Sequence, residues 1–153
     1  MLALVFAIGM IAGLRALTAP AVVCWAAHLG WLNLQSSHLA WMGSTVAVAI
    51  FSILALAEIV NDKLPATPSR LAPPSLGIRS VTGALAGTAL AVATGQSVVL
   101  GIVLGALGAL AGSFVGYHIR HAIVSGLKIP DFPVALLEDA IAIGCGLLIV
   151  SRF

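Results

Sequence analysis

Residues 98–116 read VVLGIVLGALGALAGSFVG, a run that contains no charged side chain and has a glycine at every third or fourth position. Such a run is long enough to cross the hydrocarbon core of a membrane, which is about 30 Å thick. Apolar windows of about 20 residues can be placed along the chain five times, and 61% of the residues are hydrophobic whereas 8% are charged. The sequence therefore predicts an all-α membrane protein of about five transmembrane helices, which form one integral membrane domain over residues 1–153.

Charge and cysteine content exclude several classes of function. The formal net charge is +2, and the basic residues are spread along the chain without a dense block, so we expect the lipid bilayer and not nucleic acid as a partner. Cys24 and Cys145 both lie in apolar segments, where a thiol usually behaves as a small buried hydrophobe. No zinc-ligand spacing is present, and we expect no cofactor.

The expected helices follow from the apolar runs and from the residues that interrupt them. The first covers about residues 2–31 and is interrupted at Gly13-Leu14-Arg15-Ala16 and at Pro20. Because proline kinks a helix, we expect one long kinked helix, with two half-helices as the alternative. The others cover about residues 39–60, 78–94, 98–123 and 134–151. A proline-rich connection, residues 65–74, separates the second helix from the third.

Loop charges predict the orientation in the membrane. Five spans place the termini on opposite sides, and the side of the N-terminus holds five basic residues: Lys63, Arg70, Arg79, Arg120 and Lys128. The other side has Arg152 alone. Because basic residues favour the cytoplasmic side, we expect an inner (plasma) membrane protein with a cytoplasmic N-terminus and an outside C-terminus. A central helix flanked by two pairs would also permit an inverted repeat.

Ionisable residues inside apolar runs indicate the candidate site. A carboxylate at the bilayer centre costs roughly 2.5 to 3.5 kcal/mol. Two acids end the second expected helix and two begin the fifth, all on the cytoplasmic side, where the third helix also begins. An arginine lies near mid-depth in the first helix. The candidate residues for binding an ion or a substrate are Arg15, Glu58, Asp62, Arg79, Glu138 and Asp139.

Two of these acids also have a simpler interpretation. Asp62 fits the water interface, and the positive end of the fifth helix dipole would stabilise Asp139. Glu58 and Glu138 are then the pair that most needs partners, and we expect them at similar depth, within reach of Arg15. The alternative base for them is the arginine at the start of the third helix. An ion site and a structural ion pair are both consistent with this pattern.

Two further motifs have a functional and a structural interpretation. His118 and His121 lie three residues apart on a helix and are weak candidates for metal ligands, whereas interfacial positions at a helix end explain them more simply. The glycines of residues 98–116 let another backbone approach closely. They predict either tight packing within the bundle or the seam of a homo-oligomer.

Four short segments carry a family resemblance: GLRA at residues 13–16, EIVNDKLP at 58–65, IRSVTGAL at 78–85 and LLED at 136–139. Together they resemble a family of small bacterial membrane proteins known only as domain of unknown function 4126, over nearly the whole chain. The resemblance implies a helical membrane protein and no particular activity. It supports grouping Arg15, Glu58, Asp62, Lys63, Arg79, Glu138 and Asp139.

The leading functional hypothesis is a small transporter or channel for an ion or a small polar solute. Its polar cavity would open to the cytoplasm and be lined by Glu58, Glu138, Arg15 and Arg79. One alternative is an intramembrane enzyme that acts on lipid phosphates or lipid-linked substrates, in which His118 or His121 is the acid or base and Arg70, Arg79 or Arg120 holds phosphate. The other is a non-catalytic scaffold whose ion pairs fix helix register.

Overall fold

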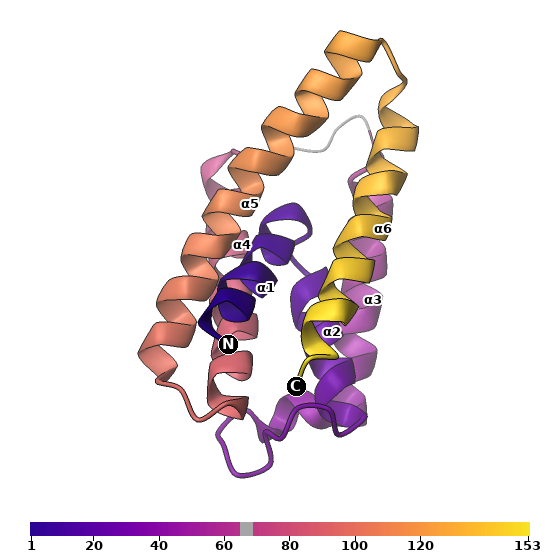
Figure 1. Ribbon diagram of the computed structural model, residues 1–153. Coiled ribbons are helices and arrows are strands. Elements are labelled where there is room, and N and C mark those ends of the chain that lie inside the picture. Colours follow the sequence, from indigo (N-terminus) through magenta and orange to yellow (C-terminus); the bar gives the residue numbers. More distant parts are fainter. Residues whose placement is uncertain (65–68) are drawn as a thin grey trace.

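The protein is a bundle of helices (Figure 1). Its structure, a computed structural model, describes residues 1–64 and 69–153. The elements are α1 (Leu2–Leu14), α2 (Thr18–His28), a short 3-10 helix η1 (Ala40–Gly43), α3 (Thr45–Asn61), α4 (Pro73–Ala93), α5 (Val98–Leu127) and α6 (Asp131–Val150). No strand occurs among these described residues, so the all-α prediction is confirmed. Residues 65–68 of the expected proline-rich connection lie outside them.

Three helices are long and apolar enough to cross a membrane: α4, α5 and α6. α1 and α3 are shorter apolar helices. The protein is therefore a membrane protein by its helices, but the expected count of five spans is not confirmed. α4 begins at Pro73, earlier than expected, because proline in the first turn of a helix removes no hydrogen bond.

The segment expected to form the first helix, residues 2–31, forms two helices in the structure. Arg15 adopts an extended backbone (φ −140°, ψ 108°) directly after α1, so the alternative of two half-helices describes the chain and the single kinked helix does not. α1 has 13 residues and α2 has 11, which at 1.5 Å per residue gives about 20 Å and 17 Å. Each is shorter than the hydrocarbon core of about 30 Å.

The chain reverses direction at this break. Gly146 of α6 faces both Ile11 of α1 and Val22 of α2, so the two halves run side by side from Arg15 toward the same end of the molecule. Figure 1 shows the result: α1 rises, α2 descends, and both termini lie at the lower end. The structure does not confirm the expected placement of the termini on opposite sides, which assumed that residues 2–31 cross the bundle once. With no odd central helix in the described chain, the inverted repeat is not confirmed either.

The glycines of α5 pack against other helices of the same chain. A Cβ atom on Gly105 would collide with the carbonyl oxygen of Gly83 in α4, and one on Gly108 would collide with the carbonyl oxygen of Phe6 in α1. Two faces of α5 therefore hold α4 and α1 at backbone contact distance. The glycine motif serves tight packing within the bundle, and a homo-oligomer would need another surface.

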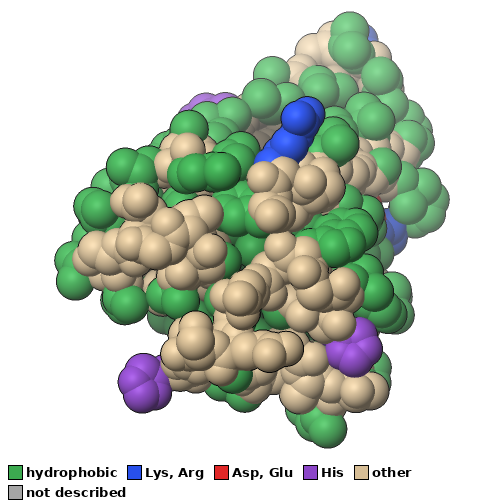
Figure 2. Space-filling model, turned by 60° about the horizontal axis from the view of Figure 1, so that its bottom comes forward, with side chains coloured by type: hydrophobic (Ala, Val, Ile, Leu, Met, Phe, Trp, Pro, Cys, Tyr) green, Lys and Arg blue, Asp and Glu red, His purple; other side chains and the backbone are tan. Residues whose placement is uncertain are grey.

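The two ends of the molecule differ in charge. The end near the termini, brought forward in Figure 2, is covered mostly by hydrophobic and uncharged side chains, and no Asp or Glu is visible on that face of the described residues. The opposite half holds the helix break, near mid-height in Figure 1, together with the end of α3 and the beginnings of α4 and α6. The fold thus gathers the acidic residues around the turn between α1 and α2.

Candidate functional site

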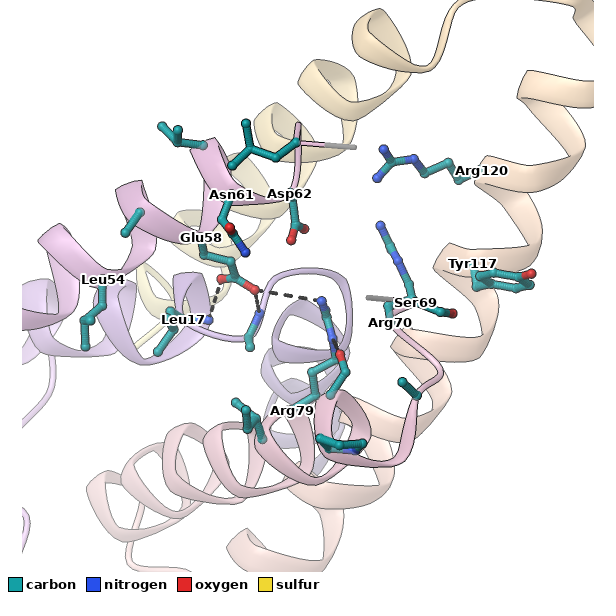
Figure 3. A pocket seen from close by; sticks show the side chains of 18 of the residues that line it. Leu17, Leu54, Glu58, Asn61, Asp62, Ser69, Arg70, Arg79, Tyr117 and Arg120 are labelled. Carbon is teal, nitrogen blue, oxygen red and sulfur yellow. Dashed lines mark hydrogen bonds and ion pairs between the residues drawn. The ribbon is translucent and has the colours of Figure 1, made fainter. Parts of the chain in front are cut away.

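The site is built around the two helix ends that the break creates. α2 begins with backbone N–H groups that no helical carbonyl accepts, and Glu58 of α3 fills this position. Its Oε1 accepts the N–H of Ala16 at 2.7 Å and its Oε2 accepts the N–H of Leu17 at 2.8 Å (Figure 3). The positive end of the α2 dipole stabilises a carboxylate here. Glu58 is thus held by the backbone of the break, which the sequence pattern did not predict.

Arg79 of α4 covers the other end of the break. Its Nη1 donates to the carbonyl oxygens of Gly13 at 2.7 Å and of Leu14 at 2.9 Å, the last residues of α1. A cation at this position matches the negative end of the α1 dipole. Nη2 of Arg79 lies 3.9 Å from Oε1 of Glu58, so opposite charges on the two helix ends also form an ion pair. Of the two expected partners of Glu58, Arg79 is the one that meets it.

Arg15, inside the break, is completely buried and lies between two aspartates. Its Nη1 donates to Asp62, and its Nη2 lies 2.6 Å from Oδ1 of Asp139. The second contact is an ion pair and not an aligned hydrogen bond, since neither atom has a hydrogen-bond partner among the described residues. Lys63 donates to the other oxygen of Asp139 at 2.7 Å. Two cations and two anions therefore balance in the interior.

The simpler interpretation of Asp139 was wrong, and Asp62 has an ion-pair partner that its simpler interpretation did not include. α6 begins at Asp131 rather than near residue 134, so Asp139 lies in the third turn of the helix, beyond its N-terminal end, and is 6% exposed. Asp62 points at Arg15, with 15% of its side chain exposed. Both aspartates compensate a buried guanidinium, which would otherwise be expensive at this depth.

Glu138 meets different bases from those expected. Both nitrogens at the tip of Arg70 contact its carboxylate, Nη2 at 2.9 Å, and Nη1 of Arg120 lies 3.3 Å away. Arg120 also binds Asp131 with two hydrogen bonds, at 2.8 Å and 2.6 Å. Glu138 therefore belongs to a group at the junction of α5 and α6. No hydrogen bond or ion pair joins Glu138 to Glu58, Arg15 or Arg79 among the described residues.

Sequence reasoning left Asp131 out of the site and gave Arg70 and Arg120 only a tentative phosphate role. One signal was present for Arg120, because it continues the four-residue steps of Gly108, Gly112 and Gly116 on the face of α5 that packs inward. No comparable pattern marks Arg70 or Asp131. All five acidic residues of the chain and five of its seven Lys and Arg residues form these pairs. The members are Arg15, Glu58, Asp62, Lys63, Arg70, Arg79, Arg120, Asp131, Glu138 and Asp139.

A cavity of about 1450 Å³ lies beside these pairs. Its charged wall includes Glu58 and Arg79 at the break and Asp62, Arg70 and Arg120 nearer the end of the molecule (Figure 3). Apolar side chains of α3 and α4 form much of the remaining wall. Of the four residues expected to line one cavity, only Glu58 and Arg79 do so. Arg15 is enclosed, and Glu138 instead borders an apolar pocket of about 190 Å³ between α1, α5 and α6.

The histidine pair does not form a metal site with its neighbours. In the part of the chain that the structure describes, no three His, Cys, Asp or Glu side chains gather closely enough to hold a metal ion. Nδ1 of His118 lies 2.7 Å from the carbonyl oxygen of Phe114 in its own helix. The His121 ring stacks on Tyr117, with centroids 6.1 Å apart and an interplanar angle of 7°.

A family model described as Domain of unknown function (DUF4126) matches residues 2–151. The chain belongs to this family. The resemblance carried by residues 13–16, 58–65, 78–85 and 136–139 is therefore confirmed over nearly the whole chain. Neither a curated protein nor a solved structure matches it. Because the DUF4126 description names no activity, the chemistry of the site has to be argued from its own geometry.

Proposed function

We propose that this DUF4126 protein is a membrane transporter or channel for an ion or a small polar solute, with the charged cavity as its binding site. The observation that carries the proposal is the broken helix, whose ends are held by Glu58 and Arg79 at the wall of that cavity. Irregular backbone at membrane depth is tolerated where it is buried in protein or lines a water-filled cavity. Discontinuous helices of this kind form the substrate and ion sites of many transporters.

Glu58 is the residue through which binding would couple to movement. Its carboxylate accepts hydrogen bonds from the two N–H groups directly before α2 and lies 3.9 Å from Arg79, which donates to the end of α1. A proton or a cation on Glu58 would weaken both attractions. A solute anion would compete with Glu58 for the same N–H groups and for Arg79. Either event changes the forces on the α1–α2 hairpin, which supplies a physical link between occupancy and conformation.

The proposed orientation places the charged end in the cytoplasm of the cell. Lys63, Arg70, Arg120 and Lys128 lie at that end or in its loops, and Arg152 lies at the other. The positive-inside rule therefore assigns the charged end to the cytoplasmic side of the inner membrane. Because the chain turns back at Arg15, both termini are then outside. The chain would act as one integral membrane domain and, in a homo-oligomer, would use lipid-facing surfaces other than the glycines of α5.

Flux measurements in proteoliposomes test the proposal. Vesicles loaded with a pH-sensitive dye would be exposed to gradients of protons, Na⁺, K⁺ and small carboxylate and phosphate anions. Glu58→Gln preserves the shape of the side chain and removes its charge, so we expect at least a tenfold loss of flux, with Arg152→Gln as the control. Equal flux in Glu58→Gln and wild type would exclude the carboxylate role, and no flux above empty vesicles across the panel would exclude transport.

A structural role is the second candidate, and the complete pairing of the five acids favours it. Its test needs a pair whose charges can be exchanged. Glu58 and Arg79 are unsuitable because each also matches the dipole of a particular helix end. Arg120→Asp combined with Asp131→Arg exchanges a pair whose acid is exposed, and because Arg120 also contacts Glu138, the double variant is compared with Arg120→Asp alone. A scaffold predicts restored stability in the double variant and no flux in the wild-type protein, whereas a transporter predicts wild-type flux.

A further inference from the structure

The cavity is larger and more apolar than an ion or a small solute requires. Pockets for drug-sized ligands enclose about 300 to 1,000 Å³, whereas this cavity encloses about 1450 Å³. A solute held between Glu58 and Arg79 would occupy only the part next to the break. The remaining space extends along α3 and the first turns of α4 toward Arg70 and Arg120.

The apolar wall of this space continues onto the outer surface of the molecule. Leu54, Leu56 and Val60 of α3 and Ile78 of α4 line the cavity and are also 40%, 63%, 63% and 57% exposed. α3 packs mainly on α2, whereas α4 packs on α5 and α1. The space between α3 and α4 is therefore bordered by exposed apolar side chains, which in a bilayer would let hydrocarbon chains enter it from the side.

Arg70 and Arg120 lie at the charged end of this wall, which we call the rim. The guanidinium of Arg120 can bind an incoming anion in place of its present partner. Arg120 binds Asp131 through two hydrogen bonds, and the Asp131 side chain is 57% exposed. An incoming anion therefore reaches this pair from the solvent and competes with Asp131 for the guanidinium. Arg70 and Arg120 both contact Glu138, so two guanidinium groups share one buried carboxylate. Paired guanidinium groups suit a phosphate, which accepts several hydrogen bonds from arginine.

We propose that the outer part of the cavity binds a membrane lipid through its phosphate headgroup. The phosphate contacts Arg120 and Arg70 at the rim, and the acyl chains run along Leu54, Val60 and Ile78 into the bilayer. The charged rim and the apolar wall follow each other in the same sequence as the headgroup and the acyl chains of a membrane lipid. The charge lies toward the end of the molecule and the apolar surface toward its middle. This site is separate from the proposed solute position at Glu58 and does not depend on transport.

Native mass spectrometry of the purified protein in detergent tests this site with three defined probes. Phosphatidylglycerol carries both the phosphate and the chains, diacylglycerol with the same chains lacks the phosphate, and inorganic phosphate lacks the chains. We expect phosphatidylglycerol to bind at least tenfold more tightly than either of the others. Comparable binding of diacylglycerol would show that the site does not recognise the phosphate headgroup. Comparable binding of inorganic phosphate would show that the site binds a soluble anion and not a lipid. Either result would overturn the proposal.

Three variants test whether the lipid lies at the rim. Arg120→Gln should weaken phosphatidylglycerol binding at least tenfold, whereas Lys128→Gln, which removes a cation from the same end outside the cavity wall, should not. Asp131→Asn removes the competing anion and should strengthen binding while leaving the fold intact. Weaker binding in Asp131→Asn, or equal loss in Arg120→Gln and Lys128→Gln, would contradict the site. Flux of a soluble ion without lipid binding would overturn this inference and leave the transport proposal standing.

Discussion

Replacing Arg15 by glutamine removes the cation that lies between Asp62 and Asp139. In the wild-type protein two cations and two anions balance here, because Lys63 also binds Asp139. After the substitution two carboxylates, 15% and 8% exposed, share one lysine. Removing one partner of a buried ion pair typically costs about 3 to 5 kcal/mol. We therefore expect Arg15→Gln to lower the free energy of unfolding by that amount, although glutamine fits the space.

Equilibrium unfolding in mixed detergent micelles measures this loss, with Arg152→Gln as a control that should change stability by about 0.5 kcal/mol or less. Adding Asp62→Asn to Arg15→Gln leaves Asp139 and Lys63 as a balanced pair. The double variant should regain about 1 to 3 kcal/mol relative to the sum of the two single losses. A loss in Arg15→Gln no larger than that of the control, or strict additivity in the double variant, would refute the charge-balance argument.

Four other substitutions are measured by the same unfolding assay. Gly108→Ala should cost about 1 to 3 kcal/mol because its Cβ meets the Phe6 carbonyl, whereas Gly126→Ala, in open space, should cost nothing. Arg79→Gln should cost about 1 to 3 kcal/mol because helix-end carbonyls lose their donor. Asp131→Asn should cost less than about 1 kcal/mol. Equal losses for the two glycine variants, or a larger loss for Asp131→Asn than for Arg79→Gln, would contradict the packing and the burial described above.

The membrane class, the positions of the long helices and the convergence of charge were predictable from local sequence. Apolar length identifies α4, α5 and α6, and the acids at the ends of apolar runs lie at one end of the molecule as expected. Pro20 correctly indicated that the first apolar segment is interrupted, but it does not kink a continuous helix. It is the third residue of α2, within the first turn, where proline starts a helix instead of kinking one.

The reversal at Arg15 was not predictable, because it depends on contacts between residues that are distant in sequence. Two helix ends can stay buried here only because Glu58 and Arg79 satisfy them, from 41 or more residues away. The ion-pair partners of Glu138 could not be predicted for a related reason. The packing of α6 on α1 and α2 turns Asp139 toward Arg15 and Glu138 toward Arg70 and Arg120, and local sequence does not reveal that packing. Loop charge alone could not reveal that the first segment turns back.

The turn between α1 and α2 creates the helix ends on which the site is built, and labelling of the two chain ends tests it. Single cysteines at Leu2 and Arg152, in a protein whose Cys24 and Cys145 are replaced by alanine, would be treated with a membrane-impermeant maleimide in sealed, uniformly oriented vesicles. The reversal at Arg15 predicts that both cysteines react from the same side of the membrane. Reaction of the two cysteines from opposite sides would show that residues 2–31 cross the membrane once, and would contradict the broken hairpin on which the site depends.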